Sequence, residues 1–222
     1  MKDFPLIKSI HPEGYRFISF FGGVAFLLAV FGFGWLAKLF FCLALFSGYF
    51  FRDPERYPPL LENSVASPAD GKIILIEQVE NTEIYGSGPC LKLSIFMSVF
   101  DVHVNRIPAS GQIVDVRYHP GKFFSANLDK AAKENERNEI IMETTGKSRL
   151  AFVQIAGLVA RRIVCQLEID DQVTKGERFG LIRFGSRLDV YLPLETMVNV
   201  HLGQRVKAGE TVLGYLPDEI KN

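Results

Sequence analysis

The chain has 222 residues, and its 25 lysines and arginines balance its 25 aspartates and glutamates. This length suits one moderate domain with an accessory segment, and the lack of a basic excess argues against nucleic acid as the main partner. The three cysteines, Cys42, Cys90 and Cys165, are far apart and odd in number, which argues against a disulfide framework and a Cys-x-x-Cys metal site. We therefore expect a reducing compartment and no bound metal.

An apolar segment extends from Phe17 to Phe51, with Lys38 as its only charged residue. It is longer than the roughly 20 apolar residues that one helix needs to cross a bilayer. The sequence Gly32-Phe33-Gly34 lies near its middle and predicts a break in the helix. After an N-terminal arm, 1–15, we therefore expect a membrane-associated hairpin over residues 16–52, with helices at about 16–31 and 35–51.

Basic residues flank the apolar segment on both sides. Lys2, Lys8 and Arg16 precede it, and Arg52 and Arg56 follow it. Because cytoplasmic loops of membrane proteins are enriched in lysine and arginine, both ends of the hairpin are expected at the cytoplasmic face of the cell membrane. A single tilted span and a very hydrophobic core helix are the alternatives.

Residues 53–222 read as one β domain that follows a proline-rich exit from the apolar segment. Short β-branched runs recur between turns, whereas one stretch, 125–135, looks helical or irregular. Regular short strands with so little helix predict a mainly β fold, a sandwich or a barrel. The expected strands are at 71–76, 91–97, 112–118, 140–143, 150–155 and 163–167.

A short internal repeat supports this fold class. The pattern Val-x-x-Gly-Glu occurs at 173–177 and again at 206–210. It places a glycine at an expected hairpin turn before a strand, because glycine adopts the backbone angles that such turns need. The pattern is similar to the turns of lipoyl- and biotinyl-carrier barrels and of related hybrid-motif β folds.

Four stretches concentrate reactive groups. They are 67–72, 96–108, 118–123 and the pair Gly185-Ser186, which lies between two apolar runs at an expected tight turn. No Gly-x-Ser-x-Gly elbow, Walker loop or pair of histidines at metal-ligand spacing accompanies them. Each stretch alone reads as an ordinary turn or strand end, so only their combination indicates a site.

In combination, these stretches resemble phosphatidylserine decarboxylase of the short bacterial and archaeal type. The resemblance covers roughly residues 50–200 and adds an apolar N-terminal anchor. It lies in the order and spacing of Phe51-Arg52-Asp53-Pro54, Pro68-Ala69-Asp70-Gly71, the stretch 97–106, Tyr118-His119-Pro120-Gly121, Asn135-Glu136-Arg137-Asn138 and Phe184-Gly185-Ser186.

The resemblance implies a proenzyme that cuts itself between Gly185 and Ser186 and converts Ser186 into a pyruvoyl group. The products would be a heterodimer of the large chain, 1–185, and the small chain, 186–222. The pyruvoyl group would form a Schiff base with phosphatidylserine and act as the electron sink for decarboxylation to phosphatidylethanolamine. No external cofactor is expected.

The family cleaves itself with an aspartate-histidine-serine relay, and Asp70 matches its aspartate. Longer members carry two histidines three residues apart, whereas this chain has His103 and then Arg106. We expect His103 to be the base, with His119 as the substitute candidate. Either histidine is also a candidate for protonating the carbanion after decarboxylation.

Three arginines are candidates for binding the substrate phosphate or carboxylate: Arg106, Arg183 and Arg187. Ordinary surface charges are an equally good reading of each. Two other functions stay open. One is a membrane-tethered lipoyl-like carrier or adaptor, for which we find no convincing lysine at a hairpin tip. The other is a decarboxylase of a related phosphoserine lipid such as archaetidylserine.

Overall fold

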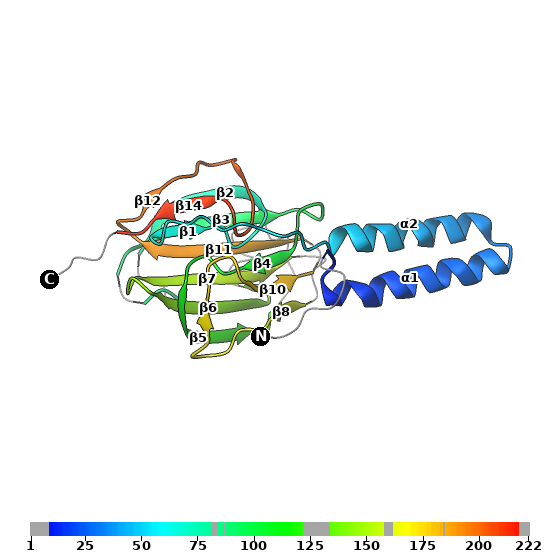
Figure 1. The fold of residues 1–222 in the computed structure, drawn as a ribbon, viewed down its shortest axis with the longest axis horizontal. Coiled ribbons are helices and arrows are strands. Elements are labelled where there is room, and N and C mark those ends of the chain that lie inside the picture. The colour runs from blue at the N-terminus through cyan, green and yellow to red at the C-terminus, as the bar shows by residue number, and fades with distance from the viewer. Residues whose placement is uncertain are drawn as a thin grey trace. The chain divides into compact units, whose positions relative to one another are not determined.

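The computed structural model describes residues 9–80, 84–86, 88–121, 134–157, 162–183 and 185–217. They fall into two units, which divide between Glu55 and Arg56. The first unit is a pair of helices and the second is a β structure (Figure 1). The mainly β fold and the preceding apolar helix pair are therefore both confirmed.

The helical unit consists of α1 (Pro12–Val30) and α2 (Gly34–Phe50). Proline in the first turn suits the start of α1, and the His11 imidazole caps it by accepting a hydrogen bond from the Glu13 amide. Gly32 links the helices with a φ of +81°, which favours glycine. The helices thus begin and end within a few residues of the expected bounds.

The two ends of the hairpin are bound to each other. The His11 amide donates to the Phe51 carbonyl at 2.8 Å, and the Asp53 amide donates to the Ser9 carbonyl at 2.8 Å. The rings of Phe17 and Phe51 stack with centroids 5.2 Å apart. Both ends therefore leave the hairpin on one side, as the basic flanks require if they are to share one face of a membrane.

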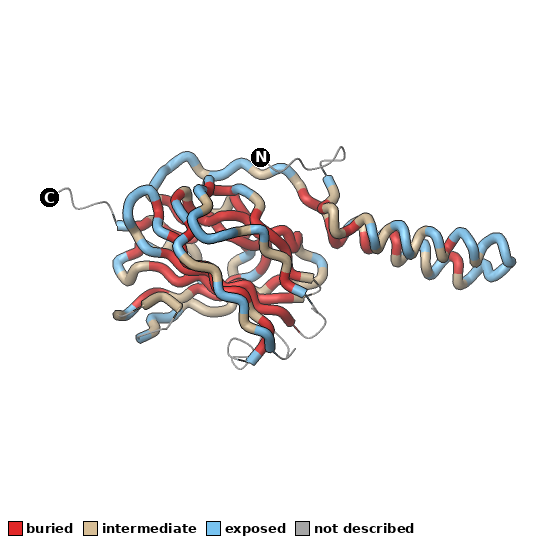
Figure 2. The backbone as a smooth tube through the Cα atoms, turned by 90° about the horizontal axis from the view of Figure 1, so that it is seen from below, coloured by how far each residue is buried: buried red, intermediate tan, exposed pale blue. Residues whose placement is uncertain are grey.

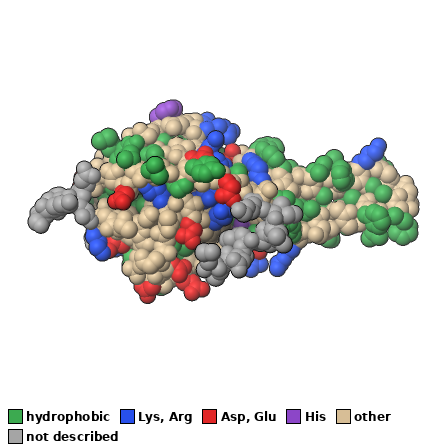
Figure 3. Space-filling view, viewed as in Figure 1, with side chains coloured by type: hydrophobic (Ala, Val, Ile, Leu, Met, Phe, Trp, Pro, Cys, Tyr) green, Lys and Arg blue, Asp and Glu red, His purple; other side chains and the backbone are tan. Residues whose placement is uncertain are grey.

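Large apolar side chains cover the outside of the hairpin (Figure 3). Among the residues that the structure describes, only α1 has the length and composition of a helix that crosses a membrane, and α2 is a shorter apolar helix. Such a surface indicates contact with lipid or protein rather than water. The exposed residues are Phe20, Phe26, Leu27, Val30, Phe31, Phe33, Trp35, Leu39, Phe41, Leu45 and Tyr49.

The described residues of the β unit form three antiparallel sheets. One has eight strands in the order β13-β2-β3-β11-β7-β6-β5-β9, and the others have the orders β1-β14-β12 and β4-β10-β8. The strands are β1 (Ser64–Ala66), β2 (Gly71–Val79), β3 (Cys90–Met97), β4 (Val104–Arg106), β5 (Gly111–His119), β6 (Arg137–Thr144), β7 (Arg149–Ala156), β8 (Ile163–Cys165), β9 (Gln172–Val173), β10 (Arg178–Ile182), β11 (Ser186–Pro193), β12 (Met197–Val198), β13 (Arg205–Val206) and β14 (Val212–Tyr215).

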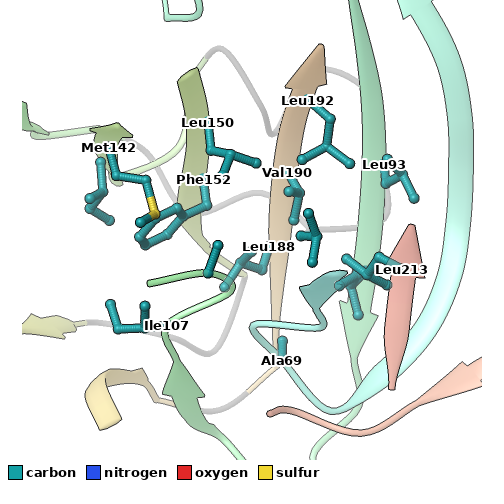
Figure 4. Close-up of a cluster of buried hydrophobic side chains, with 14 of the residues drawn as sticks. Ala69, Leu93, Ile107, Met142, Leu150, Phe152, Leu188, Val190, Leu192 and Leu213 are labelled. Carbon is teal, nitrogen blue, oxygen red and sulfur yellow. The ribbon is translucent and has the colours of Figure 1, made fainter. Parts of the chain in front are cut away.

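The eight-stranded sheet curls around the main core. Irregularities in register at 73–75 in β2 and at 113–115 in β5 increase the local twist and bend of these strands. The core includes Leu188, Val190 and Leu192 from one face of β11, and Figure 4 shows them with side chains from neighbouring strands. Buried positions follow the strands of this sheet (Figure 2).

Most of the expected strands are present. One local prediction, the hairpin at Gly176, is wrong, and another concerns residues that mostly lie outside the described ranges. The repeated glycines, Gly176 and Gly209, do lie in turns, with φ of +83° and +73°. The strands that flank Gly176 pair elsewhere, β9 with β5 and β10 with β4 and β8, so the expected hairpin is wrong. Most of the stretch 125–135 lies outside the described residues.

Candidate active site

The pair Gly185-Ser186 lies where the chain passes from one sheet to another. It connects β10 to β11, which belong to different sheets and do not pair with each other. Gly185 has a φ of +72°, a conformation that a side chain disfavours by roughly 1–2 kcal/mol. The chain therefore bends at Gly185, and the expected tight turn between two paired strands is not formed because β10 and β11 join different sheets.

Ser186 is the first residue of β11 and is fully buried. Its backbone lies opposite Met97 of β3 and Ala156 of β7. The Ser186 hydroxyl donates to the Met97 sulfur at 3.2 Å. Because a thioether is a weak acceptor, this hydrogen bond does not fix the hydroxyl strongly.

His103 lies beside this peptide bond. Its Nε2 accepts a hydrogen bond from the Gly185 amide at 3.3 Å, and its Nδ1 is 2.9 Å from the Asp101 carbonyl oxygen. Since a carbonyl oxygen only accepts, we assign the ring proton to Nδ1, which leaves a lone pair on Nε2. The His103 ring is buried and has the tautomer that a general base needs at this position.

The carboxylate of Asp70 binds groups outside this pair. It accepts from the Arg56 guanidinium at 2.9 Å and from the Ala208 amide at 2.7 Å. Its side chain is largely buried, so this ion pair is only weakly screened by solvent. Sequence reasoning did not identify Arg56 as a site residue, because no local pattern links it to Asp70.

Two of the three candidate arginines, Arg106 and Arg183, differ in burial and in their distance along the chain from Gly185. Arg106 is buried at the end of β4, and its guanidinium donates to the Gly176 carbonyl at 2.9 Å, so it supports the glycine turn. Arg183 is half-buried and lies two residues before Gly185. Of these two, Arg183 is closer in sequence to the reactive bond.

His119 and Arg187 lie on the other face of the sheet from Ser186. Directly opposed residues share a face, and the register links Arg187 through Ile155 and Arg137 to His119. Ser186 and Arg187 are consecutive in a strand, so their side chains point to opposite faces. The structure therefore does not bring His119 or Arg187 to the Ser186 hydroxyl.

Both side chains have polar partners on that other face. Arg187 is buried, and its Nε donates to one Asp189 carboxylate oxygen at 2.6 Å. Its guanidinium also donates to the Ser94 hydroxyl at 2.9 Å. His119 lies 3.2 Å from a Glu139 carboxylate oxygen.

Two buried amide side chains near Ser186 were not identified as site residues from the sequence. The Asn105 amide nitrogen lies 3.8 Å from the same Met97 sulfur, and Gln154 donates to the Asn105 side-chain oxygen at 2.9 Å. One feature of the sequence does point to Asn105, because an expected strand runs into this stretch and a residue two positions after His103 in extended backbone shares its face.

The described parts of the chain contain no group of three or more histidine, cysteine, aspartate or glutamate side chains placed to hold a metal ion. The three cysteines are free thiols. Burial raises the pKa of the Cys165 thiol, which keeps it protonated and poorly nucleophilic at neutral pH. Ser186 is therefore the nucleophile that this geometry favours.

Known proteins match the chain over most of its length. The sequence model of the phosphatidylserine decarboxylase family matches residues 43–214. A protein named phosphatidylserine decarboxylase proenzyme from Syntrophus aciditrophicus is 52% identical over 204 residues, which are 91% of this chain and 95% of that protein. Proteins of the same name from Rickettsia typhi and Citrifermentans bemidjiense are each 50% identical, over 94% and 92% of this chain and 90% and 95% of their own lengths. The chain belongs to the phosphatidylserine decarboxylase family of enzymes.

Proposed function

We propose that this chain is the precursor of a pyruvoyl-dependent decarboxylase that converts phosphatidylserine to phosphatidylethanolamine. The precursor cleaves itself between Gly185 and Ser186. The observation that carries the proposal is the hydrogen bond of 3.3 Å between the Gly185 amide and the His103 Nε2 atom. It supports the proposal because a ring nitrogen of the buried His103 lies close to Gly185, the residue whose carbonyl would be attacked.

The first step needs only groups that the site already contains. The Gly185 amide releases the lone pair of the His103 Nε2 atom, and the Ser186 hydroxyl turns from the Met97 sulfur toward it. The hydroxyl then transfers its proton to this nitrogen and attacks the Gly185 carbonyl carbon. The resulting tetrahedral intermediate carries a negative charge on its oxygen. Its collapse breaks the bond to the Ser186 nitrogen, and His103 returns the proton to that nitrogen. Glycine at 185 keeps the attacked carbonyl uncrowded.

The product of this step is an ester between Gly185 and the Ser186 side chain. Loss of the Ser186 Cα proton expels the Gly185 carboxylate and leaves a dehydroalanine at position 186. Its imine tautomer reacts with one water and releases one ammonia, so that a pyruvoyl group remains. This balance requires no oxidant and no external cofactor.

The surroundings of Ser186 fit such a group. A pyruvoyl group has no more heavy atoms than the serine residue that it replaces, and Ser186 is fully enclosed by β3, β7 and β11. Backbone pairing of β11 with β3 and β7 would hold the new end of the small chain in register. Once formed, the group supplies an electron sink for the carbanion that decarboxylation generates.

The remaining residues have supporting roles in this proposal. Arg183 binds the phosphate or carboxylate of the lipid headgroup, because a guanidinium matches both. Asp70 fixes the segment before β2 through Arg56 and Ala208, and its relay role with His103 remains part of the proposal. His103 is also the group that protonates the carbanion after loss of carbon dioxide.

The helical hairpin anchors the enzyme at the cytoplasmic face of the cell membrane, where its lipid substrate lies. Its exposed apolar surface would enter the bilayer, and the basic residues at both ends would remain in the cytoplasm. The large chain, 1–185, would carry this anchor, and the small chain, 186–222, would remain bound through β11. The substrate would then reach the site without leaving the membrane.

Intact-mass measurement of the purified protein tests the proposal. We expect two chains, 1–185 and 186–222, with the small chain beginning in a pyruvoyl group. The variant Ser186→Ala should remain one full-length chain and release no carbon dioxide from phosphatidylserine vesicles. A wild-type protein that stays full length with an unmodified Ser186 contradicts the proposal. Vesicles of archaetidylserine in the same assay distinguish the two lipid substrates.

A further inference from the structure

A chain of buried side-chain amides leads from the sheet to the Ser186 site. Asn138 donates to Gln154 at 3.4 Å, and Gln154 donates to Asn105 at 2.9 Å. The Asn105 nitrogen ends the chain at the Met97 sulfur, which also accepts from Ser186. All three amides are almost completely buried. Buried polar groups cost free energy unless they are fully paired, so this chain requires an explanation.

The hydrogen bonds along this chain differ in strength, and the Asn105 nitrogen has the weakest acceptor. Gln154 occupies the Asn105 oxygen, which fixes the orientation of the Asn105 amide and points its nitrogen toward Met97. At that end, the acceptor is a thioether at 3.8 Å, a distance typical of weak hydrogen bonds to sulfur. The Asn105 nitrogen is therefore a buried donor with unused hydrogen-bonding capacity beside the reactive serine.

The position of Asn105 matches that of His103. The two residues alternate along one extended segment, so their side chains share a face. The His103 ring reaches the Gly185 amide, whereas Asn105 reaches the atom to which the Ser186 hydroxyl donates. His103 thus contacts Gly185 directly, whereas Asn105 and Ser186 share the Met97 sulfur as a hydrogen-bond acceptor.

We propose that Asn105 is a catalytic residue of self-cleavage, whose Nδ2–H donates to the negatively charged oxygen formed on the Gly185 carbonyl. Gln154 is the positioning residue that keeps this donor pointed at the site. The inference rests on the proposed function. In the step concerned, the Ser186 oxygen bonds to the Gly185 carbon, the carbonyl π electrons move to the oxygen, and the proton goes to His103. A preorganised donor at that oxygen lowers the barrier without itself gaining or losing a proton.

The variant Asn105→Asp tests this role, because it keeps the shape and the acceptor for Gln154 but removes the donor. Cleavage of the full chain is followed by electrophoresis after cell-free synthesis at pH 8. We expect Asn105→Asp to cleave about 10²–10³-fold more slowly than the wild type, the usual effect of losing one oxyanion donor. The exposed amide Asn199 provides the control, and Asn199→Asp should cleave at the wild-type rate.

Hydroxylamine identifies the step that is affected, because it cuts an ester at the Gly185 carbonyl and leaves Ser186 at the start of the small chain. If Asn105 acts before the ester forms, hydroxylamine does not restore cleavage of Asn105→Asp. Accumulation of an ester that hydroxylamine cuts at the normal rate overturns the proposal. Asn105→Leu removes the donor without adding a charge, so its cleavage rate should keep the wild-type dependence on pH; a shifted profile would assign Asn105 to holding His103 instead.

Stability and a second variant cover the case in which Asn105→Asp folds poorly. Thermal unfolding is compared in the uncleavable Ser186→Ala background. Gln154→Leu leaves Asn105 intact but frees its orientation, and we expect cleavage at least tenfold slower than in the wild type. Cleavage at the wild-type rate by Gln154→Leu or by folded Asn105→Asp contradicts this inference while leaving the proposed function in place. A wild-type chain that does not split contradicts the proposed function itself.

Discussion

The two faces of strand β11 carry side chains with different kinds of contact. On one face, Ser186 has a weak hydrogen bond to a sulfur and lies near His103 and Asn105, groups suited to a reaction. On the other face, Arg187 and Asp189 form a buried ion pair with short contacts. The ion pair on one face stabilises the strand, so the serine on the other face does not need a strong hydrogen bond to stay in position.

The largest effect is expected from His103 on the reactive face. Loss of a general base slows a reaction by about 10²–10⁴-fold, so His103→Gln should leave nearly all of the chain uncleaved in cells. Electrophoresis of the purified protein measures the cleaved fraction. The exposed histidine gives a matched control, and His201→Gln should cleave fully. Normal cleavage of His103→Gln would assign the base to another group.

The second-largest effect is expected on stability, from the face of β11 that carries Arg187 and Asp189. In the uncleavable Ser186→Ala background, Arg187→Leu should lower the free energy of unfolding by about 3 kcal/mol. The buried Asp189 carboxylate then loses its guanidinium and keeps only the Lys92 ammonium, 3.7 Å away. Urea denaturation measures this change. The double variant Arg187→Leu/Asp189→Leu should recover most of the loss, since no charge then lacks its partner.

This pair of variants also separates two roles for Arg187. A substrate-binding role, which is one prediction from the sequence, requires that Arg187→Leu keeps its stability and cleavage but loses affinity for phosphatidylserine vesicles. Because Arg187 and Ser186 lie on different faces of the sheet, we expect instead that Arg187→Leu loses stability. Unchanged stability in Arg187→Leu would break the comparison between the two faces.

A smaller effect is expected from Arg183, two residues before Gly185. Hydrogen bonds to charged groups contribute about 1.5–3 kcal/mol, so Arg183→Gln should raise the KM for phosphatidylserine by roughly ten- to a hundredfold. Self-cleavage should stay complete, because the step does not involve an anionic ligand. The matched control is Arg117→Gln, an exposed arginine of β5, which should leave both KM and cleavage unchanged. A loss of cleavage in Arg183→Gln would give Arg183 a role in positioning Gly185 rather than in substrate binding.

Sequence patterns predicted those parts of the structure that depend on local chemistry. Apolar runs with glycine between them determined the helix pair, and β-branched runs determined the strands, since burial and alternation are visible within a few residues. A change of chain direction at Gly185 was predicted for the same reason. The position of His103 beside Gly185 came from a resemblance of ordered motifs and not from any local pattern.

Strand pairing explains what the sequence could not show. Whether β10 pairs with β11 depends on contacts between distant segments, and here each strand joins a different sheet. The partner of Asp70 is Arg56 for the same kind of reason. In contrast, the i, i+2 spacing of Arg187 and Asp189 in a strand does place them on one face, so their pairing was open to prediction.

The smallest effect is expected in the pH dependence of stability, and it concerns the face of β11 that carries Arg187 and Asp189. Burial raises the pKa of Tyr191, which follows Asp189 on this face, and burial raises the pKa of Tyr85 to about 12. A tyrosine whose pKa is higher in the folded than in the unfolded state binds its proton more tightly when folded. The contribution of each such tyrosine to stability should therefore be constant below pH 10 and fall above it, by up to about 1.4 kcal/mol per pH unit.

Tyr191→Phe removes one of these groups, so it should lose less stability between pH 10 and pH 11 than its parent, Ser186→Ala. The matched control is Tyr57→Phe, because Tyr57 is 83% exposed and its removal should not change the slope. Urea denaturation at the two pH values measures both. If Tyr191→Phe leaves the slope of stability against pH unchanged, water reaches the Tyr191 phenol in the folded protein. The face of β11 that carries Arg187 and Asp189 would then be less well shielded from water than the face that carries Ser186.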